Sequence, residues 1–241
     1  MLRLINIAAF MMLLSSGTIF KSLELFAGHG QWSKSLAQKN WQTIVRDILI
    51  DSTHNVLHQT EQLFIDKHIA LMDAVHFGLC CRTYSLAAHP PYRSPKHLRG
   101  LPTLSPKKRR RVDDADRMLQ LVVAWFLICV RAGIAVSLEN PLTSYVWRHP
   151  TLQVLMKSVS DNGPLYVVKT CYCMWGRRFK KPTAILCNYS ELFHIARRCP
   201  HEKHSVKLQG NLTGRLGNPY PEAMCNAWSE ALCLRAAVRR G

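Results

Sequence analysis

The stretch SLELFAGHGQWSKSLAQKN (residues 22–40) decides how the chain begins to fold. Its first part, up to Gly30, has the pattern of a strand that ends in a glycine-rich turn. Trp32, Leu36 and Ala37 then fall on one face of a helix. Two glycines between a strand and a helix let the backbone approach a ligand closely, although the pattern is not the G-x-G-x-x-G of dinucleotide sites. The stretch therefore predicts a strand–turn–helix unit with a ligand site at the turn.

The same alternation of strands and helices continues along the chain. Further strands are expected at TIVRDILI, LMDAVHFGL, IAVSLENP, LYVVKTCY and PTAILCN, and helices at residues 112–133, 151–163 and 221–238. The proline-rich and basic stretch at residues 87–111 is expected to be a loop. This order predicts an α/β fold with a doubly wound, mostly parallel sheet that is covered by helices on both faces.

Length and charge narrow the class of protein. With 241 residues and 48% hydrophobic content, the chain is expected to form one domain over residues 21–241 with a substantial core. The basic loop extends to about residue 112, and a small basic insert is expected at residues 189–214. Thirty-two Lys and Arg against 15 Asp and Glu give a net charge of +17, which favours nucleic acid as partner. A merely basic, solvated surface is the alternative, and no membrane partner is expected.

The cysteines and the N-terminal segment favour different cellular compartments. Nine scattered cysteines, several of them in apolar runs, are typical of a reducing compartment, so an intracellular setting in a nucleus, a virus or a mobile element is expected. The apolar leader at residues 1–20 mimics a secretory signal but runs almost directly into the first expected strand. A secreted cysteine-containing protein therefore stays open as an alternative.

Polar and reactive residues gather where the expected parallel strands end. In a doubly wound sheet, ligands bind at the carboxyl ends of the strands. Asp47, or alternatively Asp51, lies about 20 residues after the turn, where a ribose-binding carboxylate is expected in such folds. Other strand ends carry Cys80 and Cys81, and Glu139 followed by Asn140. We therefore expect one site for a nucleoside-containing cofactor and for catalysis at this edge.

The cysteine pair allows two interpretations. Either thiol is an ordinary buried side chain at a strand end, or one of them is a nucleophile. Arg82 and the basic loop beyond it favour a thiolate, and the hydroxyls of Thr83 and Ser85 hold the turn or contact a ligand. An acid at Glu139 is a plausible proton donor, with a turn-forming Glu-Asn-Pro as the alternative.

The order of these pieces resembles the carbon-5 cytosine methyltransferase superfamily. FAGHG corresponds to its F-x-G-x-G turn, CCRTYS to its P-C-x-x-F-S segment, ENP to its E-N segment, and LGNPYP to its G-N-x-x-P segment. The matching residues are Glu24, Phe26, Gly28, Gly30, Cys81, Tyr84, Ser85, Glu139, Asn140, Gly217, Asn218 and Pro221. The sequences of the remaining segments are similar to those of divergent, compact methylases of viruses and mobile elements.

The resemblance implies a Rossmann-like domain that binds S-adenosylmethionine (SAM) and methylates cytosine in DNA, with RNA as the lesser possibility. It implies Cys81 as the nucleophile and Glu139 as the acid, acting on a base that is flipped out of the duplex. The cofactor-binding residues that it implies are Phe26, Ala27, Gly28, Gly30, Asp47 and Asn218.

The chain departs from the family pattern in three ways. Cys80 stands where a proline normally precedes the nucleophile. The family's Q-x-R-x-R segment aligns with Phe179, Lys181 and Thr183, which leaves Lys181 as its single cation near the catalytic site. No space remains for a large target-recognition domain. A catalytically decayed protein that keeps the fold and binds nucleic acid is therefore the rival hypothesis.

Two basic segments are left to interpret. PKKRRR (residues 106–111) is either a nuclear-localisation-like or phosphate-contacting run, or a solvated loop. Residues expected to contact the nucleic acid are Arg82, Ser85, Arg93, Arg99 and Asn140.

CPHEKH supplies Cys199, His201 and His204, which resembles half of a zinc site, with Cys187 as a possible fourth ligand. Its spacing matches no zinc finger, so we expect a basic, polar loop without metal.

Overall fold

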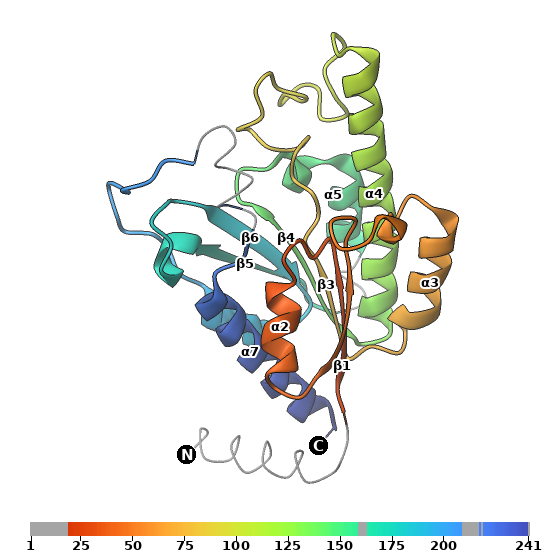
Figure 1. The fold of residues 1–241 in the computed structure, drawn as a ribbon, viewed down its shortest axis with the longest axis vertical. Coiled ribbons are helices and arrows are strands. Elements are labelled where there is room, and N and C mark those ends of the chain that lie inside the picture. The colour runs from red at the N-terminus through yellow and green to blue at the C-terminus, as the bar shows by residue number, and fades with distance from the viewer. Residues whose placement is uncertain (1–18, 159–162, 209–216, 218, 241) are drawn as a thin grey trace.

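A six-stranded sheet forms the centre of the computed structural model, which describes residues 19–158, 163–208, 217 and 219–240 (Figure 1). The strands are β1 (Lys21–Leu25), β2 (Gln42–Arg46), β3 (Ala74–Phe77), β4 (Ala135–Pro141), β5 (Tyr166–Cys171) and β6 (Pro182–Cys187). Their order across the sheet is β2-β1-β3-β4-β6-β5. The apolar leader expected at residues 1–20 falls almost entirely outside the described residues.

The sheet is parallel except at one strand. β2, β1, β3 and β4 run in the same direction, while β6 is antiparallel to both of its neighbours, β4 and β5. Leu25 pairs with Phe77, which pairs in turn with Leu138, so the residues that follow these three lie at the same edge of the sheet. The predicted mostly parallel α/β fold is confirmed.

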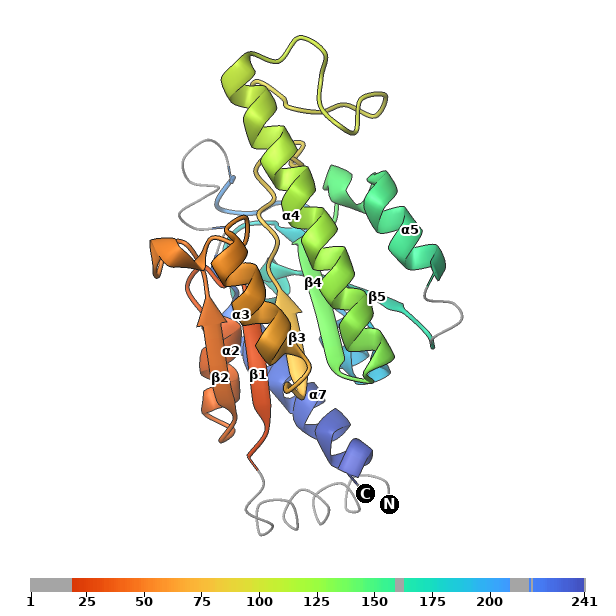
Figure 2. The same cartoon turned by 90° about the vertical axis from the view of Figure 1, so that its right-hand side faces the viewer.

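Helices cover both faces of the sheet, as a doubly wound fold requires (Figures 1 and 2). α2 (Gln31–Ala37) and α7 (Glu222–Arg240) pack together on one face. The other face carries α3 (Gln59–Ile69), α4 (Pro106–Arg131) and α5 (Pro150–Ser158). Short 3₁₀ turns are η1 (Ser52–His54), η2 (Tyr145–Arg148), η4 (Tyr172–Trp175) and η5 (Ser190–Ile195). Within the described residues, no helix is long and apolar enough to cross a membrane.

Strand alternation places different chemistry on the two faces of the sheet. Leu23, Leu25 and Phe77 are fully buried in the apolar core beneath α3, α4 and α5. Each such side chain stabilises the fold by roughly 1.5–3 kcal/mol. The residues between them, Glu24 and His76, point to the opposite face, toward α2 and α7, and are also fully buried. The second core therefore contains polar groups beneath the edge where the candidate site lies.

Two helices differ from the sequence-based expectation. The basic run expected at the end of a loop instead forms the first turns of α4, with Pro106 in its first turn. Proline suits this position because it has no N–H to leave unpaired. Arg109 donates to the carbonyl oxygens of Arg99 and Leu101, which ties the preceding loop to the helix. α3 was not expected; it is short and buries mainly Ile65 and Ile69 on its apolar face.

Candidate active site

The turn after β1 has a strained backbone that is held by its neighbours. Phe26, Gly28 and Gly30 have φ angles of 57°, 54° and 62°, in the left-handed region that glycine adopts most easily. The Phe26 N–H donates to the carbonyl of Arg46 at 3.0 Å, and the Gly30 N–H to that of Ala27 at 2.9 Å. Together these contacts fix the turn against the end of β2.

Asp47 is the acid that holds the turn. Its Oδ2 accepts from the Gly28 N–H at 2.8 Å, and its Oδ1 accepts from the Leu49 N–H at 2.7 Å. The next residue, Ile48, is 61% exposed. Asp51, the competing candidate, is exposed and caps η1 by accepting from the Thr53 N–H at 2.8 Å. The structure thus brings Asp47, and not Asp51, to the glycine turn.

Glu24 lies directly beneath this turn and is buried. Its Oε2 accepts from the Ser33 N–H at 3.0 Å, and its Oε1 has no partner among the described residues. Burial raises the pKa of Glu24 to about 7, although the hydrogen bonds from Ser33 act in the opposite direction. The folded protein therefore holds this proton more tightly than the unfolded chain, whose Glu has a pKa near 4.5.

This shift predicts a pH dependence of stability. The contribution of Glu24 is complete below pH 4.5 and is lost as the pH rises through about 7. Glu24→Gln stays uncharged and still accepts from Ser33, so its stability relative to the wild type should increase between about pH 5 and about pH 8, by up to ~3 kcal/mol. Urea unfolding of both proteins at the two pH values measures this difference. Parallel pH profiles would contradict it.

The end of β3 approaches the glycine turn closely. A Cβ added at Gly78 would lie 2.8 Å from the carbonyl oxygen of Phe26 and 2.9 Å from the Tyr220 hydroxyl. Only a glycine fits this position without displacement. Two residues further on, Cys80 is exposed, whereas Cys81 is largely covered. The chain therefore turns the second thiol inward, toward the groups at the ends of β4 and β6.

Lys181 is the cation with the strongest effect on the Cys81 thiol, ahead of the neighbouring Arg82 that the sequence indicated. Burial raises the pKa of Cys81 to about 11, the nearby charge of Lys181 lowers it, and Glu139 contributes a further rise. Arg82 itself is exposed. Because the charges of Lys181 and Glu139 both act on this thiol, the three residues lie near one another, and burial keeps Cys81 protonated at neutral pH.

Glu139 is held in one orientation by two hydroxyl groups. The Thr183 hydroxyl of β6 donates to its Oε1, and the Tyr220 hydroxyl donates to its Oε2 at 3.3 Å. The side chain is only 5% exposed. Thr183 and Tyr220 were not expected to contact Glu139. Thr183 belongs to the segment aligned with Q-x-R-x-R, where the alignment gave it no role.

A buried polar chain extends from Tyr220 into the sheet. Its hydroxyl lies 3.0 Å from Nε2 of His76, whose Nδ1 lies 3.0 Å from the Ser137 hydroxyl. Burial lowers the pKa of His76 to about 3, so this ring is neutral. Trp32 and Trp228 pack against it. This row of hydrogen-bonded side chains positions Tyr220 and, through it, the carboxylate of Glu139.

Asn140 has a structural position instead of the expected substrate contact. It is fully buried, and its Nδ2 donates to the carbonyl of Leu79 at 2.8 Å. This bond ties the loop that carries Cys81 to β4. The amide therefore has no surface through which to contact a nucleic acid in this structure.

Lys181 lies at the start of β6, half-buried over the ring of Tyr172 with its Nζ 4.3 Å from the ring centre. Its Nζ donates to the Gly217 carbonyl at 2.6 Å and to the Tyr172 hydroxyl at 3.2 Å. Lys181 thus joins the candidate site to the G-N-x-x-P segment. Asn218, the expected cofactor contact in that segment, lies outside the described residues.

Arg93 is the clearest correction to the expected nucleic-acid contacts. Its guanidinium is buried, forms an ion pair with Asp116 of α4 at 2.9 Å and stacks 4.0 Å from the ring centre of Tyr84. It also donates to the carbonyl of Thr83 at 3.1 Å. Nε2 of His149 lies 3.4 Å from the same Asp116 oxygen. Arg93 therefore holds the loop after Cys81 in place and does not reach a phosphate.

Other members of the basic loop remain accessible. Arg82 and Arg99 are exposed, and Ser85 is half-buried with its hydroxyl accepting from the Ala87 N–H at 3.1 Å. Exposed cations also stand at the N-terminal end of α4, where helix carbonyls do not offset their charge. These exposed cations belong to the loop that follows Cys81 and to the first turns of the helix after it.

Comparison with solved structures finds methyltransferases. Entamoeba histolytica methyltransferase EhMeth has a TM-score of 0.45 and 12% identity, over 80% of this chain and 57% of that one. S. pombe Dnmt2 methyltransferase has a TM-score of 0.42 and 11% identity, over 76% and 57%. A putative DNA modification methyltransferase of an E. coli prophage has a TM-score of 0.41 and 13% identity, over 70% and 46%.

The chain thus spans about half the length of these structural neighbours, from 46% to 57%. No family model matches it, and no curated protein matches it.

Proposed function

We propose that this chain is a SAM-dependent methyltransferase that methylates carbon 5 of cytosine in nucleic acid, in DNA in preference to RNA. One observation carries the proposal: Cys81 follows β3, Glu139 lies near the end of β4 and Lys181 directly precedes β6, and the three residues converge at one edge of the sheet. A nucleophile, a fixed carboxylate and a cation beside a glycine turn are the groups that this reaction needs. The resemblance in motif order supports the same reaction.

The residues at the turn fit a nucleoside-containing cofactor. Each oxygen of Asp47 accepts one backbone N–H and keeps a further lone pair, which suits the hydroxyls of a ribose. The exposed apolar side chain of Ile48 suits the face of an adenine ring. When bound, SAM would supply the electrophilic methyl group. Asp47 and the turn from Phe26 to Gly30 would hold it.

The protein groups have distinct roles in the proposed reaction. The Cys81 thiol gives its proton to solvent and its sulfur adds to carbon 6 of the cytosine, while Glu139 delivers a proton to the ring nitrogen and so neutralises the negative charge that develops there. Carbon 5 becomes nucleophilic and accepts the methyl group. The carbon-5 proton then passes to solvent, the electron pair of its bond restores the ring double bond and expels the thiolate, and the ring nitrogen returns its proton to Glu139. The charge of Lys181 favours the Cys81 thiolate both before it adds to carbon 6 and when it is expelled.

SAM binding tests the cofactor part of the proposal. We expect isothermal titration calorimetry to detect binding to the wild type, and Asp47→Ala to weaken it about tenfold or more, because a ligand hydroxyl loses its acceptor. Asp51→Ala is the matched control, since the side chain of Asp51 caps η1 by accepting from the Thr53 N–H, and the affinity of this variant should be unchanged. Equal affinities of the two variants would exclude Asp47 as the ribose ligand.

Arg99→Ala tests the nucleic-acid surface. Because Arg99 is exposed in the basic loop, we expect the variant to bind DNA more weakly, with the slope of log K against log[salt] reduced by about one. Fluorescence anisotropy with duplex DNA and with an RNA of the same sequence measures this slope. An unchanged slope would place the nucleic acid elsewhere on the molecule.

A second function is favoured by a specific observation. Cys81 has a raised pKa and Cys80 stands in place of the proline, as expected for a nucleic-acid-binding protein whose catalysis has decayed. Transfer of labelled methyl groups from SAM to cytosine-containing DNA separates the two. Binding of DNA without binding of SAM and without transfer would favour the decayed protein.

A further inference from the structure

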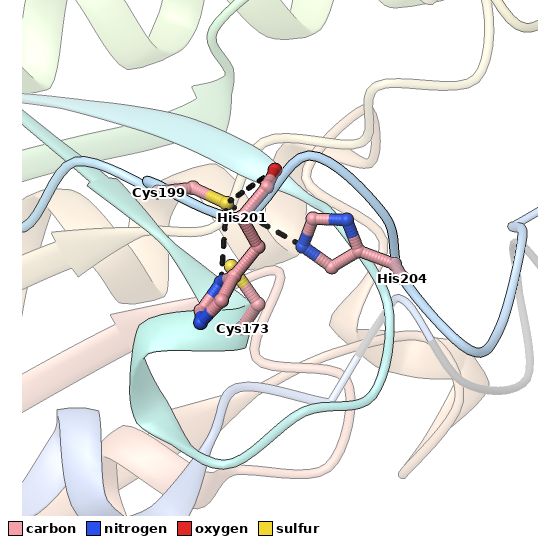
Figure 3. A group of neighbouring side chains, drawn as sticks. All are labelled: Cys173, Cys199, His201 and His204. Carbon is pink, nitrogen blue, oxygen red and sulfur yellow. Dashed lines mark hydrogen bonds between the residues drawn. The ribbon is translucent and has the colours of Figure 1, made fainter.

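Four potential metal ligands lie together away from the candidate active site. Cys173 belongs to η4, whereas Cys199, His201 and His204 belong to the segment that follows η5. One ligand atom from each lies within 4.8 Å of all the others. Figure 3 shows the four side chains pointing toward one another from these two segments. Folding thus joins the CPHEKH segment to a cysteine that lies far upstream in the sequence.

Two of the distances between ligand atoms match those of a tetrahedral zinc site, and the others are all within 4.8 Å. Zinc binds sulfur at about 2.3 Å and imidazole nitrogen at about 2.0–2.1 Å, so neighbouring ligand atoms in a tetrahedron are roughly 3.3–3.8 Å apart. The Cys199 sulfur lies 3.5 Å from Nδ1 of His201 and 3.4 Å from Nε2 of His204. Two thiols and two imidazoles are also the donor set that Zn²⁺ prefers over Mg²⁺ or Ca²⁺.

The fourth ligand differs from the one that the sequence indicated. Cys187 is fully buried in β6, and its thiol contacts the carbonyl oxygen of Tyr189 at 3.3 Å. It is not part of the cluster. Cys173 takes this place because η4 turns it toward the CPHEKH segment, a placement that spacing alone does not reveal.

We propose that Cys173, Cys199, His201 and His204 bind one Zn²⁺ ion in a closed, structural site. All four positions are filled by protein ligands, which leaves none for a reacting water. The inference does not depend on the methyltransferase proposal, because none of these residues belongs to the candidate active site.

The metal would hold a segment with little regular structure of its own. Between η5 and Val206, the described chain forms no helix or strand. Arg197 stacks 3.7 Å from the ring centre of Trp175 and donates to the carbonyl of Met174, and Val206 forms a single bridge with Phe179. Zinc would crosslink this basic segment to η4, and thus fix its cations beside the residues that lead from η4 into β6.

Metal content and Co²⁺ substitution test the proposal on the full chain. We expect elemental analysis of protein purified without chelators to find about one zinc per chain. Replacement by Co²⁺ should give the intense visible bands of a tetrahedral site and a thiolate-to-metal band in the near ultraviolet. Folded protein that lacks zinc and gives no such spectrum with added Co²⁺ would overturn the proposal.

Ligand variants assign the site. Cys173→Ala and His204→Ala should lose the tetrahedral Co²⁺ spectrum, while Cys187→Ala and His194→Ala should keep it; His194 is an exposed residue of η5 outside the cluster. Loss in Cys187→Ala with retention in Cys173→Ala would refute the assignment. If the ligand variants do not fold, the wild-type spectrum decides: a tetrahedral thiolate spectrum supports the site, and an octahedral one excludes it.

Discussion

Cys81→Ala is expected to abolish methyl transfer to DNA, with a loss of roughly three orders of magnitude or more. Without the sulfur, no group on the chain adds to carbon 6 of the cytosine, so carbon 5 stays too weakly nucleophilic to react. SAM affinity should be unchanged, because Asp47 and the glycine turn do not depend on the thiol. Transfer of labelled methyl groups, together with calorimetry on the same samples, measures both quantities.

Cys80→Ala is the matched control. Cys80 is exposed, whereas Cys81 is turned toward Glu139 and Lys181, so removal of the first thiol should leave most of the activity. Equal losses in the two variants would mean that the pair acts as a unit or that the loop is disturbed. Loss of methyl transfer in Cys80→Ala only would show that Cys80, and not Cys81, is the nucleophile.

Arg93→Ala is expected to destabilise the protein by about 3–5 kcal/mol. Its guanidinium is buried and paired with Asp116, and its removal leaves a mostly covered carboxylate without its main counter-charge. Urea unfolding at neutral pH measures the loss. The exposed Arg99 provides the comparison, because Arg99→Ala should change stability by no more than about 0.5 kcal/mol.

The two arginines separate stability from binding. Arg93→Ala should lower the free energy of unfolding, whereas Arg99→Ala should alter the salt dependence of DNA binding. A stable Arg93→Ala protein with a reduced salt slope would show that Arg93 is turned outward in solution and contacts phosphate. In that case the sequence-based expectation would be restored.

Most of the fold follows from the sequence pattern. Five of the strands beyond the glycine turn lie where apolar, β-branched runs predict them, and the long α4 follows from its helical spacing. The reversed direction of β6 does not follow, because a strand buried on both faces has the same composition in either orientation. The start of α4 was also misplaced, since a run of cations near a helix N-terminus opposes the helix dipole.

The candidate site was predictable only in part. Cys81 and Glu139 stand at strand ends, where parallel-sheet geometry concentrates ligand-binding residues. Their partners come from distant segments: Thr183 opens β6, and Tyr220 precedes α7. Hydrogen bonds between residues so far apart depend on side-chain direction, which spacing in the sequence does not specify.

Composition does not distinguish a buried arginine from an exposed one in the basic loop. Arg93 and Arg99 occupy the same basic loop, and composition gives them the same expected role. Their difference arises from Asp116 and Tyr84, which provide a carboxylate and a ring face for one guanidinium only. A charged residue is seldom buried without such a partner. The burial of Arg93 therefore depends on partners whose position the sequence of the loop does not specify.

Covalent trapping tests the central claim most directly. DNA that contains 5-fluorocytosine lacks the carbon-5 proton whose loss releases the enzyme, so the adduct persists once the methyl group has been transferred. With SAM present, we expect the wild type to form a denaturation-resistant adduct, detected as a mass increase on the peptide that contains Cys81, and Cys81→Ala to form none. A wild-type protein that binds both SAM and this DNA but forms no adduct would contradict the account.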